Sequence, residues 1–133
     1  MGSQVTFAKG VLAEICAAAA ASPDEVCGLL FGTPDHVEAA QPCRNVAAAP
    51  ATTFEIDPAQ LVAAYREARR GGPVLIGCYH SHPSGDAMPS PCDASAAEAN
   101  SWLWLIVTGG ELRAFRAVEE GTIYGRFDPV LVR

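Results

Sequence analysis

The stretch that decides how this chain folds and what it can do is GCYHSHPSGDAMPSPCD, residues 77–93. In it a single serine separates two histidines, and three prolines, two aspartates and a cysteine follow them. The apolar lead of residues 73–79 predicts a strand. The proline and glycine of residues 83–90 predict a loop. Ser90-Pro91 is typical of a helix start, and we expect that helix to run to about residue 100.

The two histidines are candidates for metal ligands. Alternate side chains of a strand share one face, so His80 and His82 point the same way. Two neutral imidazoles supply half of a zinc site, and catalytic zinc needs a third protein ligand and an open position for water. Asp93, in the first turn of the following helix, can reach the metal if the loop folds back. Pro83 and Pro89 limit the freedom of that loop.

Other interpretations of the histidine pair stay open at this point. Two histidines at a strand end are often ordinary polar residues. Cys78 shares the predicted face of the pair, and Cys92 adjoins Asp93. Either thiol is therefore a candidate ligand of a structural Cys/His zinc site, which would have no open position.

The pattern of the remaining chain predicts the α+β class, with a mostly antiparallel central sheet flanked by about three helices. Asp57-Pro58 is typical of a helix start, and we expect Leu61, Val62, Tyr65 and Ala68 to form the buried face of that helix. Gly109-Gly110 predicts the turn of a hairpin. The predicted helices are 7–21, 58–70 and 91–100, and the predicted strands are 25–32, 36–43, 53–56, 73–82, 102–108, 111–118 and 122–127.

Composition limits the class of protein. A chain of 133 residues, half of them hydrophobic, is expected to form one globular domain over 1–133. Met1-Gly2-Ser3 is interpreted as a remnant of cloning. A net charge of -6 argues against a nucleic-acid partner. No apolar run approaches roughly 18 residues, so no membrane span is expected. Five cysteines without a CxxC pair favour a reducing cytoplasm over a disulfide framework.

The stretch resembles, residue for residue, the JAMM motif of the MPN+ zinc metalloproteases, and the compact prokaryotic members in particular. That motif reads His-Ser/Thr-His-Pro, a loop, and Ser-x-x-Asp. Here it is His80-Ser81-His82-Pro83, then Ser90-Pro91-Cys92-Asp93. The family also carries a glutamate before a Cys-Gly-Leu-Leu-like run, and Glu25 precedes VCGLLFG here. The resemblance implies the MPN fold, which is similar to that of cytidine deaminases.

The resemblance also implies a role for each motif residue. His80, His82 and Asp93 correspond to the ligands of one zinc ion per chain, with a water completing the tetrahedron. Glu25 corresponds to the general base that takes the proton of that water and delivers it to the leaving amine. Ser90 corresponds to the hydroxyl that stabilises the oxyanion. On this interpretation the cysteines are not ligands.

The family resemblance implies a peptidase or isopeptidase that cuts after the C-terminal Gly-Gly of a ubiquitin-like or ThiS-like sulfur-carrier protein. An extended tail can add to a sheet edge, and glycine allows the backbone to approach the metal closely. One alternative is release of a single amino acid, such as cysteine, from a sulfur carrier. A second alternative is a non-catalytic MPN scaffold that only binds partners. The substrate, the linkage preference and the oligomeric state stay open.

Overall fold

The computed structural model describes residues 3–83 and 85–133. Met1 and Gly2, two of the three residues interpreted as a cloning remnant, lie outside them. Within the described residues, seven strands close into one barrel in the order β1-β3-β2-β4-β5-β6-β7. The elements in chain order are β1 (Gln4–Phe7), α1 (Val11–Ala20), β2 (Cys27–Thr33), β3 (His36–Cys43), α2 (Pro58–Arg69), β4 (Leu75–Ser81), α3 (Pro91–Ala96), β5 (Leu103–Thr108), β6 (Glu111–Gly121) and β7 (Gly125–Val132).

The sheet closes into a barrel, which the sequence analysis did not predict, although most of its strand pairs are antiparallel as expected. Four neighbouring pairs are antiparallel, but β4 pairs with β5 in parallel, and β1 pairs in parallel with both β3 and β7. The strand β1 closes the barrel, and the sequence analysis placed its last residue in a helix. A four-residue strand is too short to show a clear alternation of apolar and polar residues.

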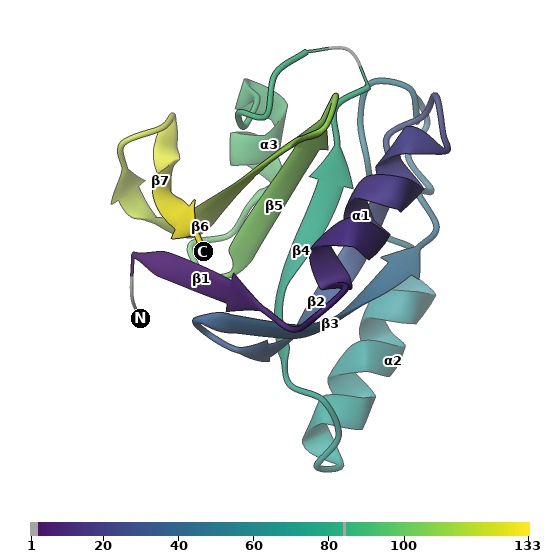
Figure 1. Cartoon of the computed structure of the whole chain (residues 1–133), viewed down its shortest axis with the longest axis vertical. Helices are drawn as coiled ribbons and strands as arrows, with labels where there is room; N and C mark the ends of the chain where they lie inside the picture. The colour runs from purple at the N-terminus through teal and green to yellow at the C-terminus, as the bar shows by residue number, and fades with distance from the viewer. Residues whose placement is uncertain (1–2, 84) are drawn as a thin grey trace.

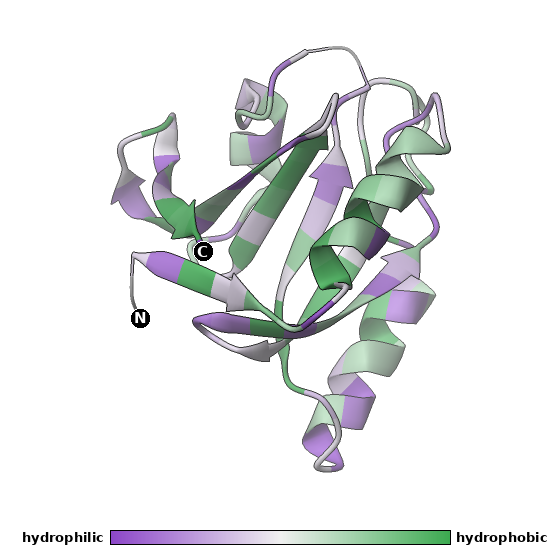
Figure 2. Ribbon diagram, viewed as in Figure 1, coloured by the Kyte–Doolittle hydropathy of each residue, from purple (hydrophilic) through white to green (hydrophobic). Residues whose placement is uncertain are grey.

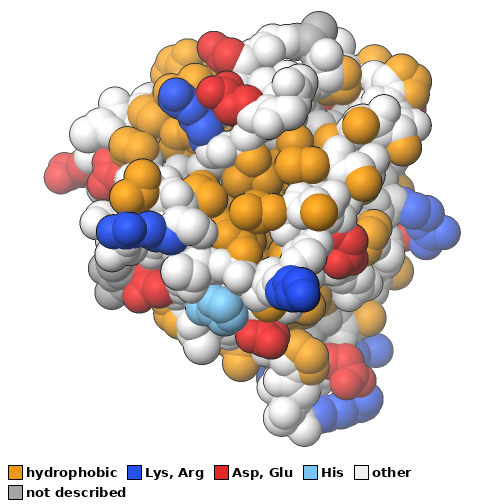
Figure 3. All heavy atoms as spheres, viewed as in Figure 1, with side chains coloured by type: hydrophobic (Ala, Val, Ile, Leu, Met, Phe, Trp, Pro, Cys, Tyr) orange, Lys and Arg blue, Asp and Glu red, His pale blue; other side chains and the backbone are white. Residues whose placement is uncertain are grey.

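The barrel encloses the main hydrophobic core, and one helix packs onto it. Val11 and Ile15 of α1 join a buried cluster with Leu30, Tyr79 and Leu105. Figure 1 shows α1 across the front of the barrel, α2 along the outside of β2 and β3, and α3 on the far side near β5. Figure 3 shows hydrophobic side chains gathered over β4 and β5 between β1 and α1. The first helix therefore covers part of the apolar interior.

Two further clusters of buried hydrophobic residues lie outside the main core. One contains Leu29 and Phe31 of β2 with Ala64 of α2, and the other contains Trp104 of β5 and Phe127 of β7. In Figure 2 the largely apolar β5 runs beside the hydrophilic end of β4, which carries the motif. No helix among the described residues combines the length and the apolarity that crossing a bilayer requires.

Several predicted helix boundaries were wrong, and each error has a local cause. The helix predicted over 7–21 begins only at Val11, because Phe7 pairs in β1 and Gly10 has a left-handed backbone with φ of 87°. The helix predicted over 91–100 ends at Ala96, because Ala97 is extended. Tertiary pairing and a single backbone reversal therefore override helix propensity at both places.

The predicted buried face of α2 was also partly wrong. Ala64 is the buried residue of this helix, whereas Val62 and Tyr65 are 47% and 44% exposed. The predicted strand over 53–56 is reduced to an isolated bridge between Asn45 and Ile56. The strand predicted over 122–127 instead begins at residue 125 and runs to residue 132.

Candidate metal centre

The end of β4 brings the two motif histidines together. His80 lies within the strand, where it faces Cys27 of β2 and Ile106 of β5. His82 follows the strand, and its backbone N–H donates to the carbonyl of Val107 at 2.9 Å. The strand ladder thus extends one bond past β4, and this bond fixes the backbone that carries the second imidazole.

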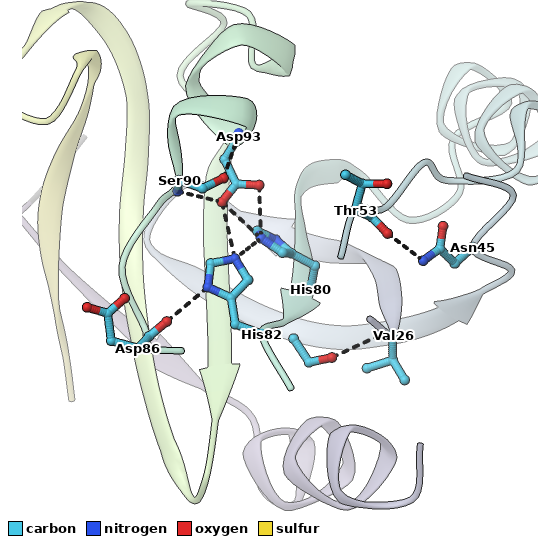
Figure 4. A network of polar contacts seen from close by, with 9 residues as sticks. Val26, Asn45, Thr53, His80, His82, Asp86, Ser90 and Asp93 are labelled. Atoms are coloured by element: carbon cyan, nitrogen blue, oxygen red, sulfur yellow. Dashed lines mark hydrogen bonds and ion pairs between the residues drawn. The ribbon is translucent and has the colours of Figure 1, made fainter. Parts of the chain in front are cut away.

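The imidazoles and the carboxylate of Asp93 converge on one point (Figure 4). The Nε2 atoms of His80 and His82 lie 3.1 Å apart. The Nε2 atom of His80 lies 3.2 Å from Oδ1 and 3.2 Å from Oδ2 of Asp93. The Nε2 atom of His82 lies 3.3 Å from Oδ2 of Asp93.

These separations fit a tetrahedral metal ion. Zinc bonds of about 2.0–2.1 Å in a tetrahedral arrangement keep neighbouring ligand atoms about 3.3 Å apart. The three separations here are 3.1, 3.2 and 3.3 Å. Two imidazoles and one carboxylate are also a donor set that zinc accepts at a catalytic site. The residues present could therefore hold a metal ion.

Different contacts orient the two histidine rings. The Nδ1–H of His82 donates to the backbone carbonyl of Asp86 at 2.9 Å, which directs its Nε2 lone pair toward the convergence point. The Nδ1 atom of His80 is buried and has no hydrogen-bond partner among the described residues. Instead, the ring of Phe54 stacks on His80 with centroids 4.2 Å apart, and Trp104 meets it edge-on at 5.7 Å.

The start of α3 fixes Asp93. Ser90 and Asp93 form a capping box, in which the Ser90 side chain accepts from the Asp93 N–H at 3.0 Å. The Asp93 carboxylate accepts from the Ser90 N–H at 2.9 Å. Pro91 at the first helical position favours the same start. The same carboxylate therefore caps a helix and faces the two imidazoles.

The predicted general base reaches the histidines from the chain segment before β2. Glu25 is buried, and the Glu25, His80 and His82 side chains each offer a ligand atom within 4.8 Å of the others. Its backbone N–H donates to the carbonyl of Pro50 at 2.8 Å. Burial raises the pKa of Glu25 from 4.5 to about 7, against the opposing effect of His82. A carboxylate with such a pKa can exchange protons near neutral pH.

The ionisation states of His80 and Asp93 suit metal ligands, whereas the hydrogen bond with Asp93 raises the pKa of His82. Burial lowers the pKa of His80, which favours its neutral form. Burial alone would raise the pKa of Asp93, but its hydrogen bonds with His80 and His82 outweigh that effect and hold the pKa well below its usual value. A neutral imidazole and an ionised carboxylate are the forms that bind a metal.

A small cavity opens beside these groups. It has a volume of about 180 Å³ and is lined by Glu25, Ala51, Thr52, His82, Pro83 and Ser90. The glutamate, one imidazole and the serine thus reach a common space. The Ser90 oxygen accepts from the Asp93 N–H, and its hydroxyl donates to no acceptor among the described residues, so it can donate to an acceptor that enters this space.

Among the described residues, neither cysteine considered as a rival ligand forms a hydrogen bond with His80, His82 or Asp93. Cys78 is buried in the cluster with Trp104 and Ile106, and burial raises the pKa of its thiol well above the usual value. Cys92 is exposed. A cysteine binds a metal as the thiolate, and burial disfavours the thiolate form of Cys78.

Three contact residues went unnoticed in the sequence. Ser81 appeared only as the residue between the histidines, but its hydroxyl accepts from the Val26 N–H at 2.9 Å and so joins β4 to the segment that carries Glu25. Asn45 and Phe54 lie in the segment that was interpreted as loop and short strand. A lone asparagine and a lone aromatic give no periodic signal, so the sequence alone could not have selected them.

The sequence matches a known domain family. The family described as prokaryotic homologs of the JAB domain matches residues 8–118. This segment contains the whole motif and most of the barrel. The chain therefore belongs to this JAB domain family, which agrees with the JAMM/MPN+ resemblance of its motif.

The named relatives include a desampylase and a probable conjugate cleaving protease. The desampylase of Haloferax volcanii is 41% identical over 91 residues, which cover 67% of this chain and 66% of the relative. A probable TtuB-protein conjugate cleaving protease of Thermus thermophilus is 41% identical over 76 residues, 57% of this chain and 51% of the relative. The similarity thus spans about half to two thirds of these relatives.

Solved structures share the architecture. A protein from Desulfitobacterium hafniense has a TM-score of 0.81 at 29% identity, over 98% of this chain and 92% of that one. A JAB1/MPN domain protein from Archaeoglobus fulgidus has a TM-score of 0.56 at 22% identity, over 99% of this chain and 100% of that one. The fold is therefore the MPN fold.

Proposed function

We propose that this protein is a zinc-dependent peptidase or isopeptidase that hydrolyses the bond after the C-terminal Gly-Gly of a ubiquitin-like or sulfur-carrier protein. The observation that carries the proposal is the convergence of two imidazoles and a carboxylate at separations of 3.1–3.3 Å, with Glu25 beside them. The relatives named as desampylase and conjugate cleaving protease support the substrate class.

His80, His82 and Asp93 would hold one zinc ion, with Nε2 atoms and a carboxylate oxygen as donors. Zinc bound there supplies a water of lowered pKa and polarises the carbonyl to be cut. The backbone carbonyl of Asp86 keeps His82 in the tautomer that presents Nε2. The burial of His80 keeps its imidazole neutral.

Glu25 moves the proton. Its carboxylate takes a proton from the attacking water and returns it to the leaving amine, which balances the hydrolysis. Its burial and its raised pKa of about 7 make both directions of transfer accessible near neutral pH. Glu25 thus acts as the general base and then as the general acid.

Ser90 stabilises the developing charge. Its oxygen accepts from the Asp93 N–H, so its own proton can be donated to the oxyanion of the substrate carbonyl. The adjoining cavity of about 180 Å³ is small, and residues without bulky side chains fit it best. A Gly-Gly tail meets that requirement, because glycine allows close approach of the backbone.

The test is a cleavage assay on an isopeptide conjugate of a small ubiquitin-like protein that ends in Gly-Gly. A matched conjugate ends in Ala-Ala. We expect cleavage of the first and little or none of the second, with loss of cleavage after chelation and recovery after zinc is returned. Cleavage that survives chelation would refute the metal mechanism. A zinc-loaded protein that binds the conjugate without cutting it would instead be a binding scaffold.

A further inference from the structure

The orientation of His80 lacks the hydrogen bond that usually fixes a metal-binding histidine. Such a ring normally donates its second N–H to a carboxylate or a carbonyl. The Nδ1 atom of His80 has no such partner among the residues that the structure describes, although it is fully buried. Phe54 lies parallel to the ring instead, at 4.2 Å and an interplanar angle of 18°. Contact with this aromatic ring must therefore limit the rotation of the imidazole.

Phe54 belongs to the connection between β3 and α2, and one amide side chain organises that connection. The Nδ2 group of Asn45 donates to the carbonyl of Thr53 at 2.9 Å, next to Phe54 (Figure 4). The Oδ1 atom of Asn45 accepts from the N–H groups of Ala47 and Glu55, both at 3.0 Å. The residues on both sides of Phe54 are thus hydrogen-bonded to Asn45.

The same amide also holds the opposite side of the site. The Nδ2 group of Asn45 donates to the backbone carbonyl of Glu25 at 2.9 Å. The Glu25 N–H donates to Pro50 in the same connection. Both backbone polar groups of the catalytic glutamate are therefore bonded to the connection between β3 and α2.

We infer that Asn45 is a positioning residue of this site, which holds Glu25 directly and orients His80 through the stacked ring of Phe54. This inference rests on the proposed function. One side chain then fixes the distance between the proton acceptor and a metal ligand that lie 55 residues apart in the sequence. Catalysis requires such groups to keep their geometry within a fraction of an ångström, and a shared anchor provides this.

Zinc affinity is the measurement that separates positioning from general support of the fold. In Phe54→Leu the side chain remains apolar but the stacking is lost. In Phe54→Tyr the stacking remains. Phe115→Leu is the matched control, because Phe115 is buried in the cluster that packs against Phe54 and its ring contacts Phe127. Zinc dissociation constants come from competition with a chromophoric chelator, and thermal midpoints are measured without metal.

We expect Phe54→Leu to weaken zinc binding by about 10-fold or more, the range for residues that orient a ligand. Phe54→Tyr should restore it to within about twofold of the wild type. Phe115→Leu should lower the thermal midpoint and leave the zinc dissociation constant unchanged. Equal zinc affinity in Phe54→Leu and the wild type would overturn the role of Phe54.

Asn45→Asp tests the shared anchor. The aspartate keeps the acceptor for Ala47 and Glu55 but loses the donor to Glu25 and Thr53. We expect kcat to fall by about 10-fold with KM nearly unchanged, and zinc binding to weaken as in Phe54→Leu. The variant that combines Asn45→Asp with Phe54→Leu should bind zinc no more weakly than the single variant with the lower zinc affinity. Both changes remove the same support of the His80 ring, so their effects should not add.

Multiplying effects in the double variant, or an unchanged kcat in Asn45→Asp, would overturn the inference. If Asn45→Asp does not fold, the comparison of Phe54→Leu with Phe115→Leu still decides how His80 is oriented. A wild type that binds zinc but cuts no conjugate would refute the proposed function. The zinc affinities of Phe54→Leu and Asn45→Asp relative to the wild type would still test the inference.

Discussion

At the scale of single residues, the candidate ligands are held by unlike forces. His82 has a hydrogen bond to the carbonyl of Asp86, His80 has an aromatic ring stacked on it, and Asp93 has the N–H of Ser90. Each contact leaves one donor atom directed at the same point. These contacts limit the freedom of the three side chains, which reduces the entropy that they would lose on binding a metal.

Glu25→Gln should keep the fold and the zinc while turnover falls by about 100-fold or more, because an amide cannot accept the proton of the attacking water. Single-turnover cleavage and zinc content, measured on the same preparation, check this. Asp24→Asn is the matched control, since Asp24 is the adjacent exposed carboxylate and should stay near wild type. A Glu25→Gln protein that cuts at nearly the normal rate would contradict the assigned base.

Asp93→Ala should lose tightly bound zinc, and cleavage should be lost with it. The change removes the carboxylate that lies 3.2 and 3.3 Å from the two Nε2 atoms. Asp86→Asn should retain both properties, because Asp86 contacts His82 through its backbone carbonyl. Zinc content by mass spectrometry decides the point. Full occupancy in Asp93→Ala would mean that another group, such as the Cys92 thiol, is a ligand.

At the scale of elements, β4 sets the position of the site. Its neighbours are β2 in antiparallel and β5 in parallel, so His80 is fixed from both sides. The helix α3 has only six residues and depends on its capping box and on Pro91 to start. A buried strand and a short capped helix therefore hold the donors, and the loop between them carries the orienting carbonyl of Asp86.

Gly77→Ala should destabilise the protein by about 3 kcal/mol or more, because added volume in a tight strand contact cannot be relieved by a side-chain movement. A Cβ at this position would lie 2.0 Å from the backbone oxygen of Leu103. Denaturant unfolding measures the loss, and zinc affinity should fall because β4 shifts.

Gly110→Ala serves as the control for that experiment. Its Cβ would meet nothing within 4 Å, and its φ is +89°. The left-handed backbone should cost only about 1 kcal/mol, and zinc affinity should not change. Equal losses of stability in Gly77→Ala and Gly110→Ala would show that the close approach of β4 and β5 is not the reason for a glycine at position 77.

At the scale of the whole molecule, barrel closure brings distant segments to one site. The segment before β2, the end of β4 and the start of α3 meet there, although Glu25 and Asp93 lie 68 residues apart in the sequence. The connection from Asp93 to β5 contains the remainder of α3 and residues 97–102, which form neither helix nor strand. This connection is therefore short, and it offers little area of its own to a second protein module.

We expect weak discrimination among conjugates that differ only in the lysine that carries the linkage. Recognition would depend on the Gly-Gly tail, which enters the small cavity beside Glu25 and Ser90. Side-by-side kcat/KM values for dimers of one ubiquitin-like module, joined through different lysines, should agree within about 10-fold, since no interface adds the roughly 1.4 kcal/mol that a larger ratio needs. A strong preference for one linkage would reveal a second binding surface.

The sequence by itself determined the local half of the site. His80 and His82 share a face because strands have a period of two, and Ser90 to Asp93 can form a capping box because helix starts have fixed spacing. These relations hold over a few residues, where backbone geometry alone decides which side chains meet. The assignment of Glu25 rested on family resemblance and on its place before an apolar strand, and no local rule brings residue 25 to residue 80.

Only the tertiary structure decided the other half. The closure by β1, the exposure of Val62 and Tyr65, and the contacts of Asn45 and Phe54 depend on strand register and on packing between distant segments. Such contacts carry no periodic signal, because each involves one residue whose partner is chosen by the whole fold. The physical reason is that local backbone geometry acts over a few residues, whereas the burial of apolar surface acts over the entire chain.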